Sequence, residues 1–485
     1  MRSTIVSSLR WISAAKLLGQ ILTWAMTLVV IRLLSADDYG LMALAMAFIS
    51  FGAMFSDLGL GVAIIQAKEC PREHIAEVFG MLLLIGVGIC LILLALSQPI
   101  ALFFGEPHLG DVLRALALQF PIGAFSAVPK ALLQREMRFK VFSMIEVSTA
   151  VVTGVTTFGF ALTGHGVWSL VAGSLVGAVW SSVTAYVAAP LLVMPRFAWT
   201  NTRRLVSVGG KVTASRMLWY VTTQADVFIV GKLLGKEALG HYSVAFQLAS
   251  LPMSKLMSIV NQVALPGFAR VQDDKDAVVR SVVAGVSLIA FAAFPVFFGM
   301  SATADQIVHL VLGDKWSAAT LPLQLIPLCM PLRMIASYVS TAVQGIGRPD
   351  VDLRNTILTF CVLPPAFYVG CQFGLGGICV AWIVAVPALF LINMKRLLAV
   401  THAGQREVYL AMAAPAVLSI AMMAVIKFVE LGTRDAFPLP IQLAVSVVVG
   451  GVTYLGGYWL FRRADLRHIW GMVRGHAPSG VAVQQ

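Results

Sequence analysis

The sequence predicts an all-α integral membrane protein with about 14 transmembrane helices, arranged as two parallel six-helix repeats plus two C-terminal helices. Hydrophobic residues make up 59% of the 485 positions and charged residues only 12%, about half the charged fraction of an average soluble domain. Mean hydropathy is +0.86. Predominantly apolar stretches, each as long as a bilayer-crossing helix requires, recur along the whole chain. This composition excludes a soluble protein.

Fourteen apolar stretches are long enough to cross a membrane. They fall at residues 12–34, 40–64, 78–104, 111–133, 142–163, 166–190, 207–233, 240–263, 281–303, 317–343, 355–373, 375–394, 408–429 and 438–461. The first stretch follows a basic start, as in a signal peptide. It is long, however, Lys16 interrupts it, and no small-residue cleavage site follows its end, so we interpret it as an uncleaved first span.

The distribution of basic residues predicts the orientation of these spans. Of the 35 Lys and Arg residues, 24 fall in connections on one side of the predicted spans and 6 in connections on the other. Under the positive-inside rule the basic side is cytoplasmic, which places both termini of this multi-pass protein in the cytoplasm. The sequence pI of about 9.6 therefore reflects membrane orientation, and it does not indicate nucleic-acid binding.

The chain contains an internal repeat. The segment Ile31–Gly40 matches Gly231–Gly240 without a gap, and a second, slightly shifted match pairs Gln134–Arg138 with Gln344–Arg348. Two matches in the same order, each after an equivalent span, indicate a duplication. Because each repeat carries an even number of spans, both insert the same way up and are related by an axis along the membrane normal.

The repeat defines the expected domains. Residues 1–195 form an N-terminal six-helix lobe and residues 196–400 a C-terminal six-helix lobe. Residues 401–463 add two transmembrane helices, and 464–485 form a cytoplasmic tail. Transporters with internal repeats bind their substrate between the repeats and work by alternating access. No connection is long enough for a folded catalytic domain, so we do not expect an enzyme.

Five cationic side chains fall within predicted spans, and one of them, Arg114, is close enough to the outer interface to snorkel, which leaves four. A charge at the bilayer centre costs about 2.5–3.5 kcal/mol unless a wet cavity or a partner compensates it. Each of the four shares a helical stripe with other polar residues, and two of them are repeat counterparts. We predict a water-filled cationic cavity that binds an anionic substrate, and Arg suits phosphate because its planar fork binds it bidentately. The predicted substrate-binding residues are Lys16, Arg216, Lys255 and Arg333.

Other polar residues complete the predicted site. Those that share the stripes and line the cavity are Gln20, Tyr220, Asn261 and Gln262. Two acidic residues in spans, Asp57 and Asp226, are candidates for proton or sodium coupling, or they only neutralise cations in the cavity, and the sequence leaves both interpretations open. No cofactor or metal is predicted, since the six cysteines and eight histidines lack metal-ligand spacing.

Prolines indicate where the spans bend. Three prolines precede Arg333 in the tenth span, at positions 322, 327 and 331, and Pro252 precedes Lys255 in the eighth. Proline removes a backbone donor and kinks a transmembrane helix. These two spans are therefore the expected gates of the transporter.

Several motifs resemble those of Wzx-type polysaccharide flippases. They are Arg32-Leu33-Leu34 followed by Asp38-Tyr39-Gly40-Leu41-Met42-Ala43, Phe55-Ser56-Asp57-Leu58-Gly59-Leu60-Gly61, Leu133-Gln134-Arg135 with Phe139, and Asp226 with Val230-Gly231, Leu234-Gly235, Leu239-Gly240 and Tyr242. Through these residues the chain resembles the polysaccharide transporter family of the multidrug/oligosaccharidyl-lipid/polysaccharide flippase superfamily. The resemblance covers the whole length in span number and layout.

The resemblance implies a specific activity. Such a protein flips an undecaprenyl-pyrophosphate-linked oligosaccharide from the cytoplasmic to the periplasmic leaflet of the bacterial cell inner membrane, for exopolysaccharide or lipopolysaccharide biosynthesis. It also implies V-shaped lobes, a final helix pair that helps to hold the lipid tail, and membrane lipids and polysaccharide polymerase machinery as partners. A doubly anionic pyrophosphate matches the cationic cavity predicted from the residues alone.

Three alternatives stay open. A multidrug or toxin-type cation antiporter of the same superfamily is expected to have an acidic cavity, whereas cations outnumber anions in these spans. A lipid II flippase would share the chemistry but serve peptidoglycan. A membrane polysaccharide polymerase or glycosyltransferase needs a sizeable outer catalytic loop, and every outer connection predicted here is short.

Overall fold

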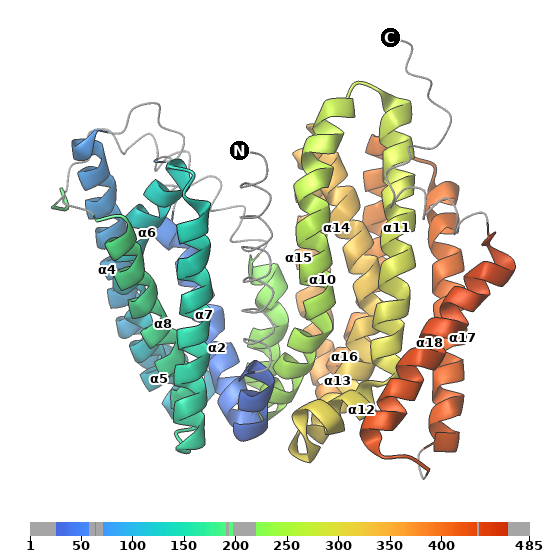
Figure 1. The fold of residues 1–485 in the computed structure, drawn as a ribbon, viewed down its shortest axis with the longest axis horizontal. Helices are drawn as coiled ribbons and strands as arrows, with labels where there is room; N and C mark the ends of the chain where they lie inside the picture. Colours follow the sequence, from blue (N-terminus) through green and yellow to red (C-terminus); the bar gives the residue numbers. More distant parts are fainter. Residues whose placement is uncertain are drawn as a thin grey trace. The chain divides into compact units, whose positions relative to one another are not determined.

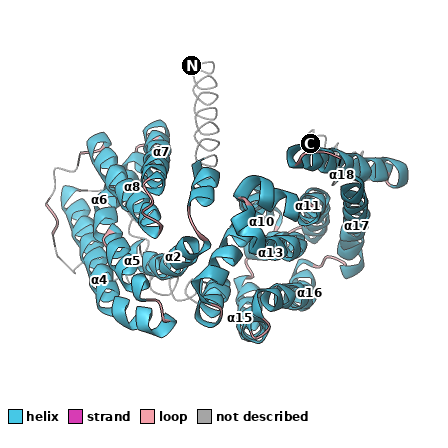
Figure 2. Cartoon of the chain, turned by 90° about the horizontal axis from the view of Figure 1, so that it is seen from below, coloured by secondary structure: helices cyan, strands magenta, loops and turns pink. Residues whose placement is uncertain are grey.

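The computed structural model describes residues 26–57, 64, 71–190, 194–196, 220–433 and 436–463, and within these ranges the regular structure is helical (Figure 1). The chain divides into two compact units, Met1–Ser243 and Val244–Gln485. Viewed from below, most helices of each unit are seen close to end-on, so within a unit they run along a common direction (Figure 2). This is the arrangement expected of a bundle that crosses a membrane.

Unit 1, Met1–Ser243, contains paired long helices. The element bounds are α2 (Ala36–Asp57), α4 (Arg72–Phe104), α5 (Pro107–Ala117), α6 (Gln119–Arg135), α7 (Phe139–Leu162) and α8 (Val167–Ala188), and residues 220–233 are also helical. The helix α7 packs along α8, and α6 packs on both α4 and α8. An apolar core between α4 and α6 is formed by Ile64, Val78, Phe79, Leu82, Ala124, Val128 and Ala131.

Unit 2, Val244–Gln485, begins within a long helix. Its elements are α10 (Gly235–Val271, which starts in unit 1), α11 (Lys275–Ala302), α12 (Ala304–Ile307), α13 (Thr320–Leu325), α14 (Met330–Gly345), α15 (Pro349–Cys371), α16 (Gly374–Thr401), α17 (Gln405–Thr433) and α18 (Leu439–Phe461). A π turn over Val308–Leu312 and 3₁₀ turns over Asp314–Ala319 and Ile326–Cys329 connect the shorter pieces. The final pair, α17 and α18, packs on α11, where Tyr454 donates a hydrogen bond to the Phe291 carbonyl at 2.8 Å.

The predicted fold class is confirmed, and most predicted spans coincide with helices. Within the described ranges, eleven helices are long and apolar enough to cross a membrane. The helix α15 is not among these eleven, but it covers the eleventh predicted span. The first and seventh predicted spans begin outside the described residues and end in helical residues 26–33 and 220–233. The described residues therefore do not decide the exact count of fourteen.

Two turns support the predicted duplication. At the end of α6, the N–H of Arg138 donates to the Leu133 carbonyl at 2.9 Å, and Met137 has a φ of 57°. At the end of α14, the N–H of Arg348 donates to the Val343 carbonyl at 3.0 Å, and Gly347 has a φ of 79°. Both ends are Schellman motifs, in which a left-handed residue lets the chain satisfy the last helical carbonyls. The second sequence match is thus also a match of backbone conformation.

A break in one span of each half adds to this correspondence. The helices α5 and α6 are separated at Leu118, and Pro121 follows. The helices α13 and α14 are separated by the 3₁₀ turn Ile326–Cys329, and Pro331 follows. Both breaks share the pattern Leu-x-x-Pro at the same offset as the two turns, and each proline lacks the N–H that would continue the helical ladder. Span 10 is thus interrupted near its prolines and span 4 at the equivalent place, whereas α10, the eighth span, runs through Pro252 as one helix.

The first sequence match corresponds to a reciprocal backbone contact within unit 1. A Cβ atom placed on Gly40 of α2 would overlap the Lys236 carbonyl, and one placed on Gly240 of α10 would overlap the Ala36 carbonyl. Both glycines lie in regular helix, so they are required for close approach rather than for an unusual φ. An ion pair of 3.0 Å from Lys236 to Glu106 lies beside this crossing. We call this contact the glycine crossing.

Replacing Gly40 or Gly240 by alanine is expected to lower the free energy of unfolding by about 1–3 kcal/mol, because the added methyl forces the two backbones apart. Thermal unfolding of the purified protein in detergent measures the change. The control is Gly159→Ala on the exposed face of α7, where a Cβ meets nothing within 4 Å. That substitution is expected to be neutral or to stabilise by about 0.5–1 kcal/mol. Wild-type melting temperatures for both Gly40→Ala and Gly240→Ala would contradict the crossing.

Candidate functional site

Arg333 lies over two neighbouring aromatic rings in unit 2. Its guanidinium carbon is 4.8 Å from the centre of the Trp382 ring of α16 and 5.8 Å from that of Phe246 of α10. The two rings are themselves 5.6 Å apart, and Phe367 packs on Trp382 from α15 at 5.1 Å. The side chain of Arg333 is half-buried. Two helices, α10 and α16, therefore place aromatic rings beside one cation at the start of α14, directly after the helix break, and α15 packs on one of these rings.

The geometry of this arginine suits an oxyanion. Stacking on an aromatic ring uses the faces of the guanidinium plane and contributes about 0.5–2 kcal/mol, depending on how far the pair is removed from water. The N–H donors radiate within the plane, in the fork that matches phosphate and carboxylate oxygens. The Sγ of Cys329 donates to the Trp382 carbonyl at 3.4 Å, which links α16 to the break itself. The ring beneath the cation is thus linked to the residue that ends the helix break.

The other predicted residues of unit 2 lie on α10. Lys255 and Gln262 are exposed, and Asn261 is half-buried. Gln262 donates a hydrogen bond to Ser258 Oγ at 3.5 Å, as expected of residues on one helical stripe. Asn261 Oδ1 accepts a hydrogen bond from Thr341 Oγ1 of α14 at 3.1 Å. The polar residues of the eighth span therefore contact the tenth span through Thr341, the neighbour of Ser340.

The sequence interpretation missed Asp352. This half-buried carboxylate of α15 accepts hydrogen bonds from Ser340 Oγ and, at 3.1 Å, from Gln344 Nε2. Both donors lie on the polar stripe of the tenth span, which consists of Arg333, Ser337, Ser340 and Gln344 at helical spacing. The sequence signal was the pair of acidic residues at the start of the eleventh span, which is the usual place for acids that stabilise a helix N-terminus. The stripe therefore runs from a cation to a carboxylate.

Tyr220 is buried in unit 1 and joins two helices. Its hydroxyl donates to the Ala47 carbonyl of α2 at 2.6 Å and accepts from Gln224 Nε2 at 3.1 Å. These contacts give it a packing role in the described structure, in addition to the cavity-lining role predicted from the sequence.

Asp226 is enclosed in unit 1. Its side chain belongs to a residue only 3% exposed, and its two oxygens accept hydrogen bonds from the Tyr242 hydroxyl at 2.5 Å and from the Val227 N–H at 2.9 Å. Tyr242, on α10, is completely buried. A carboxylate in this position is costly unless it is hydrogen-bonded or takes up a proton. It therefore keeps both interpretations that the sequence gave it, coupling or neutralisation.

The remaining predicted site residues cannot be placed. Lys16, Gln20 and Arg216 lie outside the described residues, and Asp57 is the last residue of α2, with its side chain outside the described part. Among the described residues, no group of three or more His, Cys, Asp or Glu side chains is arranged to hold a metal ion.

Comparison with known proteins decides the family. Residues 29–321 match the sequence profile of a family described as polysaccharide biosynthesis protein. The chain belongs to this family. It is 26% identical to the succinoglycan biosynthesis transport protein ExoT of Rhizobium meliloti over 93% of this chain and 92% of that protein. It is 24% identical to the lipopolysaccharide biosynthesis protein WzxC of Escherichia coli, over 77% and 76%. It is also 24% identical to the teichuronic acid biosynthesis protein TuaB of Bacillus subtilis, over 84% of this chain and 85% of that protein.

Solved structures agree on the fold. The lipid II flippase MurJ in an inward closed conformation superposes with a TM-score of 0.74, at 15% identity, over 94% of this chain and 99% of that one. An inward-facing multidrug resistance MATE family transporter superposes with a TM-score of 0.61, at 15% identity, over 78% and 95%. The prediction of a Wzx-type polysaccharide flippase is confirmed. The family and its structural neighbours are transporters and flippases, not enzymes.

Replacing Tyr242 by phenylalanine is expected to destabilise the protein by about 1–3 kcal/mol, because the buried Asp226 carboxylate loses a donor. Asp226→Asn should cost less, since the amide oxygen still accepts from the tyrosine. The double variant Asp226→Asn/Tyr242→Phe should be less destabilised than the sum of the two, as expected of directly coupled groups. Melting temperatures in detergent check all three, and strictly additive effects would contradict the coupling.

Proposed function

We propose that this protein translocates an undecaprenyl-pyrophosphate-linked oligosaccharide across the bacterial inner membrane, from the cytoplasmic to the periplasmic leaflet. The flipped repeat unit would then be polymerised into exopolysaccharide or lipopolysaccharide. Relatives named for lipopolysaccharide, succinoglycan and teichuronic acid biosynthesis support this substrate class. The eleven apolar helices support a multi-pass location, and the charge distribution supports cytoplasmic termini.

The observation that carries the proposal is the environment of Arg333. A lipid-linked sugar has three parts: a hydrocarbon tail that stays in lipid, a doubly anionic pyrophosphate and a polar oligosaccharide. Only the pyrophosphate requires a cation at membrane depth. Arg333, which lies over the rings of Phe246 and Trp382 beside a helix break, carries the guanidinium proposed to bind it. Lys16, Arg216 and Lys255 are the further cations proposed to bind it.

The mechanism that we propose is alternating access. The polar stripes of α10 and α14, which include Asn261, Gln262 and Gln344, provide a wet path suited to sugar hydroxyls. The breaks near Pro121 and Pro331 supply points at which a span can bend without breaking a complete hydrogen-bond ladder. Asp226 and Asp57 are the proposed sites for proton or sodium coupling. A polysaccharide polymerase is the proposed recipient of the product.

A lipid II flippase is the second candidate function. The superposition on MurJ shows that a lipid II flippase has the same fold, and lipid II carries the same pyrophosphate-linked prenyl tail. A cation antiporter is less well supported, because the best-defined charged side chain of unit 2 at membrane depth is a cation. A strain that lacks the protein and fails to make surface polysaccharide, while its cell wall is unaffected, would favour the polysaccharide substrate.

Arg333→Gln is expected to abolish polysaccharide export, and Arg333→Lys to restore it only in part, because lysine keeps the charge but loses the planar fork. Loss of one charge-assisted interaction of about 1.5–3 kcal/mol corresponds to a roughly 10- to 150-fold loss of affinity. Surface polymer and lipid-linked intermediates are measured in a deletion strain that carries each variant. Arg216→Gln is expected to behave like Arg333→Gln.

The matched control is Arg463→Gln. Arg463 also stacks on a tryptophan, Trp459, at 3.9 Å, but it is exposed at the end of α18. Removing it should leave export unchanged. Normal polymer from both Arg333→Gln and Arg216→Gln, at wild-type protein levels in the membrane, would refute the cationic site.

A further inference from the structure

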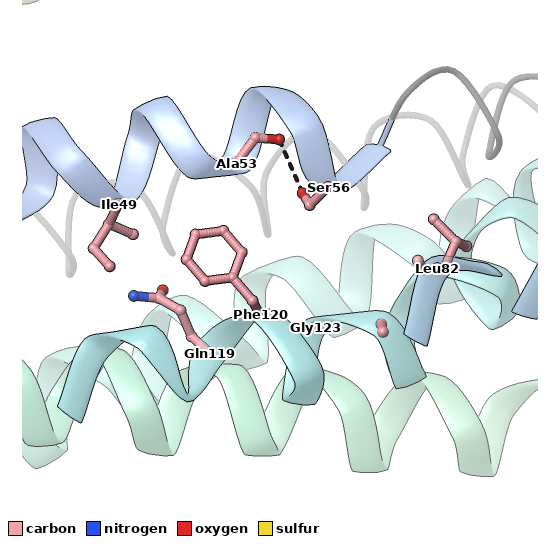
Figure 3. A pocket seen from close by; sticks show the side chains of 9 residues that line it. Ile49, Ala53, Ser56, Leu82, Gln119, Phe120 and Gly123 are labelled. Carbon is pink, nitrogen blue, oxygen red and sulfur yellow. Dashed lines mark hydrogen bonds between the residues drawn. The ribbon is translucent and has the colours of Figure 1, made fainter. Parts of the chain in front are cut away.

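Unit 1 contains a cavity that the cationic site does not include. It has a volume of about 260 Å³ and lies between α2, α4 and α6 (Figure 3). Its volume is about nine times a water molecule's share of the liquid, so it is large enough for more than a single bridging water. The side chains and backbone that line it are Ile49, Ala53, Ser56, Leu82, Gln119, Phe120, Gly123, Ala124 and Ala127.

The cavity begins at the helix break of unit 1. Gln119 is the first residue of α6, directly after the interruption at Leu118. This break lies near the middle of the span Pro107–Arg135, and therefore near the middle of the membrane. Interrupted transmembrane helices at the bilayer midplane are where transporters form their substrate sites, because irregular backbone is tolerated there only beside a cavity or within protein.

The internal repeat relates this cavity to the arginine site. Aligning Pro121 with Pro331 places Gly123 at the position of Arg333. At this position unit 2 carries a long cationic side chain, whereas unit 1 carries none. A Cβ atom on Gly123 would meet nothing within 4 Å. The two breaks therefore share an interrupted helix with the pattern Leu-x-x-Pro, but they differ in the side chain two residues after the proline.

The cavity holds a donor with no partner in the described structure. The Nε2 atom of Gln119 is buried and donates to no protein oxygen within hydrogen-bond distance. Figure 3 shows the Gln119 amide and the Phe120 ring extending from α6 toward Ile49 of α2. Leaving a buried amide donor unsatisfied costs about 1–3 kcal/mol. An occupant with an acceptor oxygen would remove that cost.

The lining residues select the class of occupant. None of the nine is charged, so a phosphate group would lack a counter-charge there. A hydrocarbon chain would leave the glutamine donor unpaired. A neutral, oxygen-rich ring would accept a hydrogen bond from the Gln119 amide and would pack on Phe120. Its hydroxyl groups would donate to Ser56 Oγ, which already donates its own proton to the Ala53 carbonyl at 2.9 Å.

We propose that this cavity is a subsite for one sugar ring of the lipid-linked oligosaccharide, so that Gln119 and the open space at Gly123 help to select which sugar the protein accepts. The proposal rests on the proposed function, since it takes its ligand from the same substrate. It concerns the neutral part of that substrate, whereas the cationic site of the proposed function concerns the anionic part.

Binding to the purified protein in lipid nanodiscs tests the subsite. The probes are the oligosaccharide-bearing lipid extracted from the deletion strain and undecaprenyl pyrophosphate without sugar. Gln119→Leu removes the donor, and Gly123→Leu fills the cavity. Each is expected to weaken binding of the sugar-bearing lipid by about fivefold or more, which corresponds to roughly 1 kcal/mol, while binding of undecaprenyl pyrophosphate stays unchanged.

The matched control for Gly123→Leu is Gly88→Leu on α4, another helical glycine with nothing within 4 Å of its Cβ position but outside the cavity lining. It should affect neither probe, and melting temperatures verify that every variant is folded. Unchanged binding of the sugar-bearing lipid by both cavity variants, or equal weakening of both probes, would overturn the subsite and leave water as its occupant. A wild-type protein that binds neither probe would instead refute the proposed function, and the subsite with it.

Discussion

A hydrocarbon interior offers a polypeptide no hydrogen-bond partners, and the helices of this protein follow from that constraint. Each long helix satisfies its own backbone, which leaves apolar side chains to face lipid. Where prolines remove a donor, near Leu118 and again over Ile326–Cys329, the freed backbone must lie against protein or a wet space. The two features with the most evident chemistry, the cavity at Gln119 and the stacked Arg333, both adjoin these breaks.

The duplication gives the chain two copies of one broken span, and the copies have diverged in side chains more than in backbone. Both spans end in the same left-handed turn, although Met137 occupies it in one copy and Gly347 in the other. A non-glycine residue in that conformation costs about 1–2 kcal/mol, so the turn itself is retained against an energetic preference. By contrast, the position after the break is glycine in one copy and arginine in the other. A substrate with neutral and anionic parts is a physical reason for such a division.

Much of the fold could be predicted from the sequence, because local composition alone is enough to recognise a transmembrane helix. The apolar lengths located the spans, and the match of Gln134–Arg138 with Gln344–Arg348 identified a real structural repeat. The site was less predictable, since its contacts join residues far apart in the chain. Arg333 was found from its depth in a span, but its two aromatic neighbours were not. Asp352 was overlooked because a helix N-terminus explains an acid without any partner, and Gln119 because it lies on no polar stripe.

The glycine crossing has a consequence for how the two copies can change over time. At most positions a duplicated segment is free to drift, since each copy has its own neighbours. At Gly40 and Gly240 each copy is the other's neighbour, and a side chain on either would displace the partner's backbone at Ala36 or Lys236. A mutation at either glycine therefore displaces the backbone of the other copy. Because the clash is with a backbone carbonyl, no change of a side chain in that copy can relieve it. The two segments, 200 residues apart in the chain, are therefore constrained to change together.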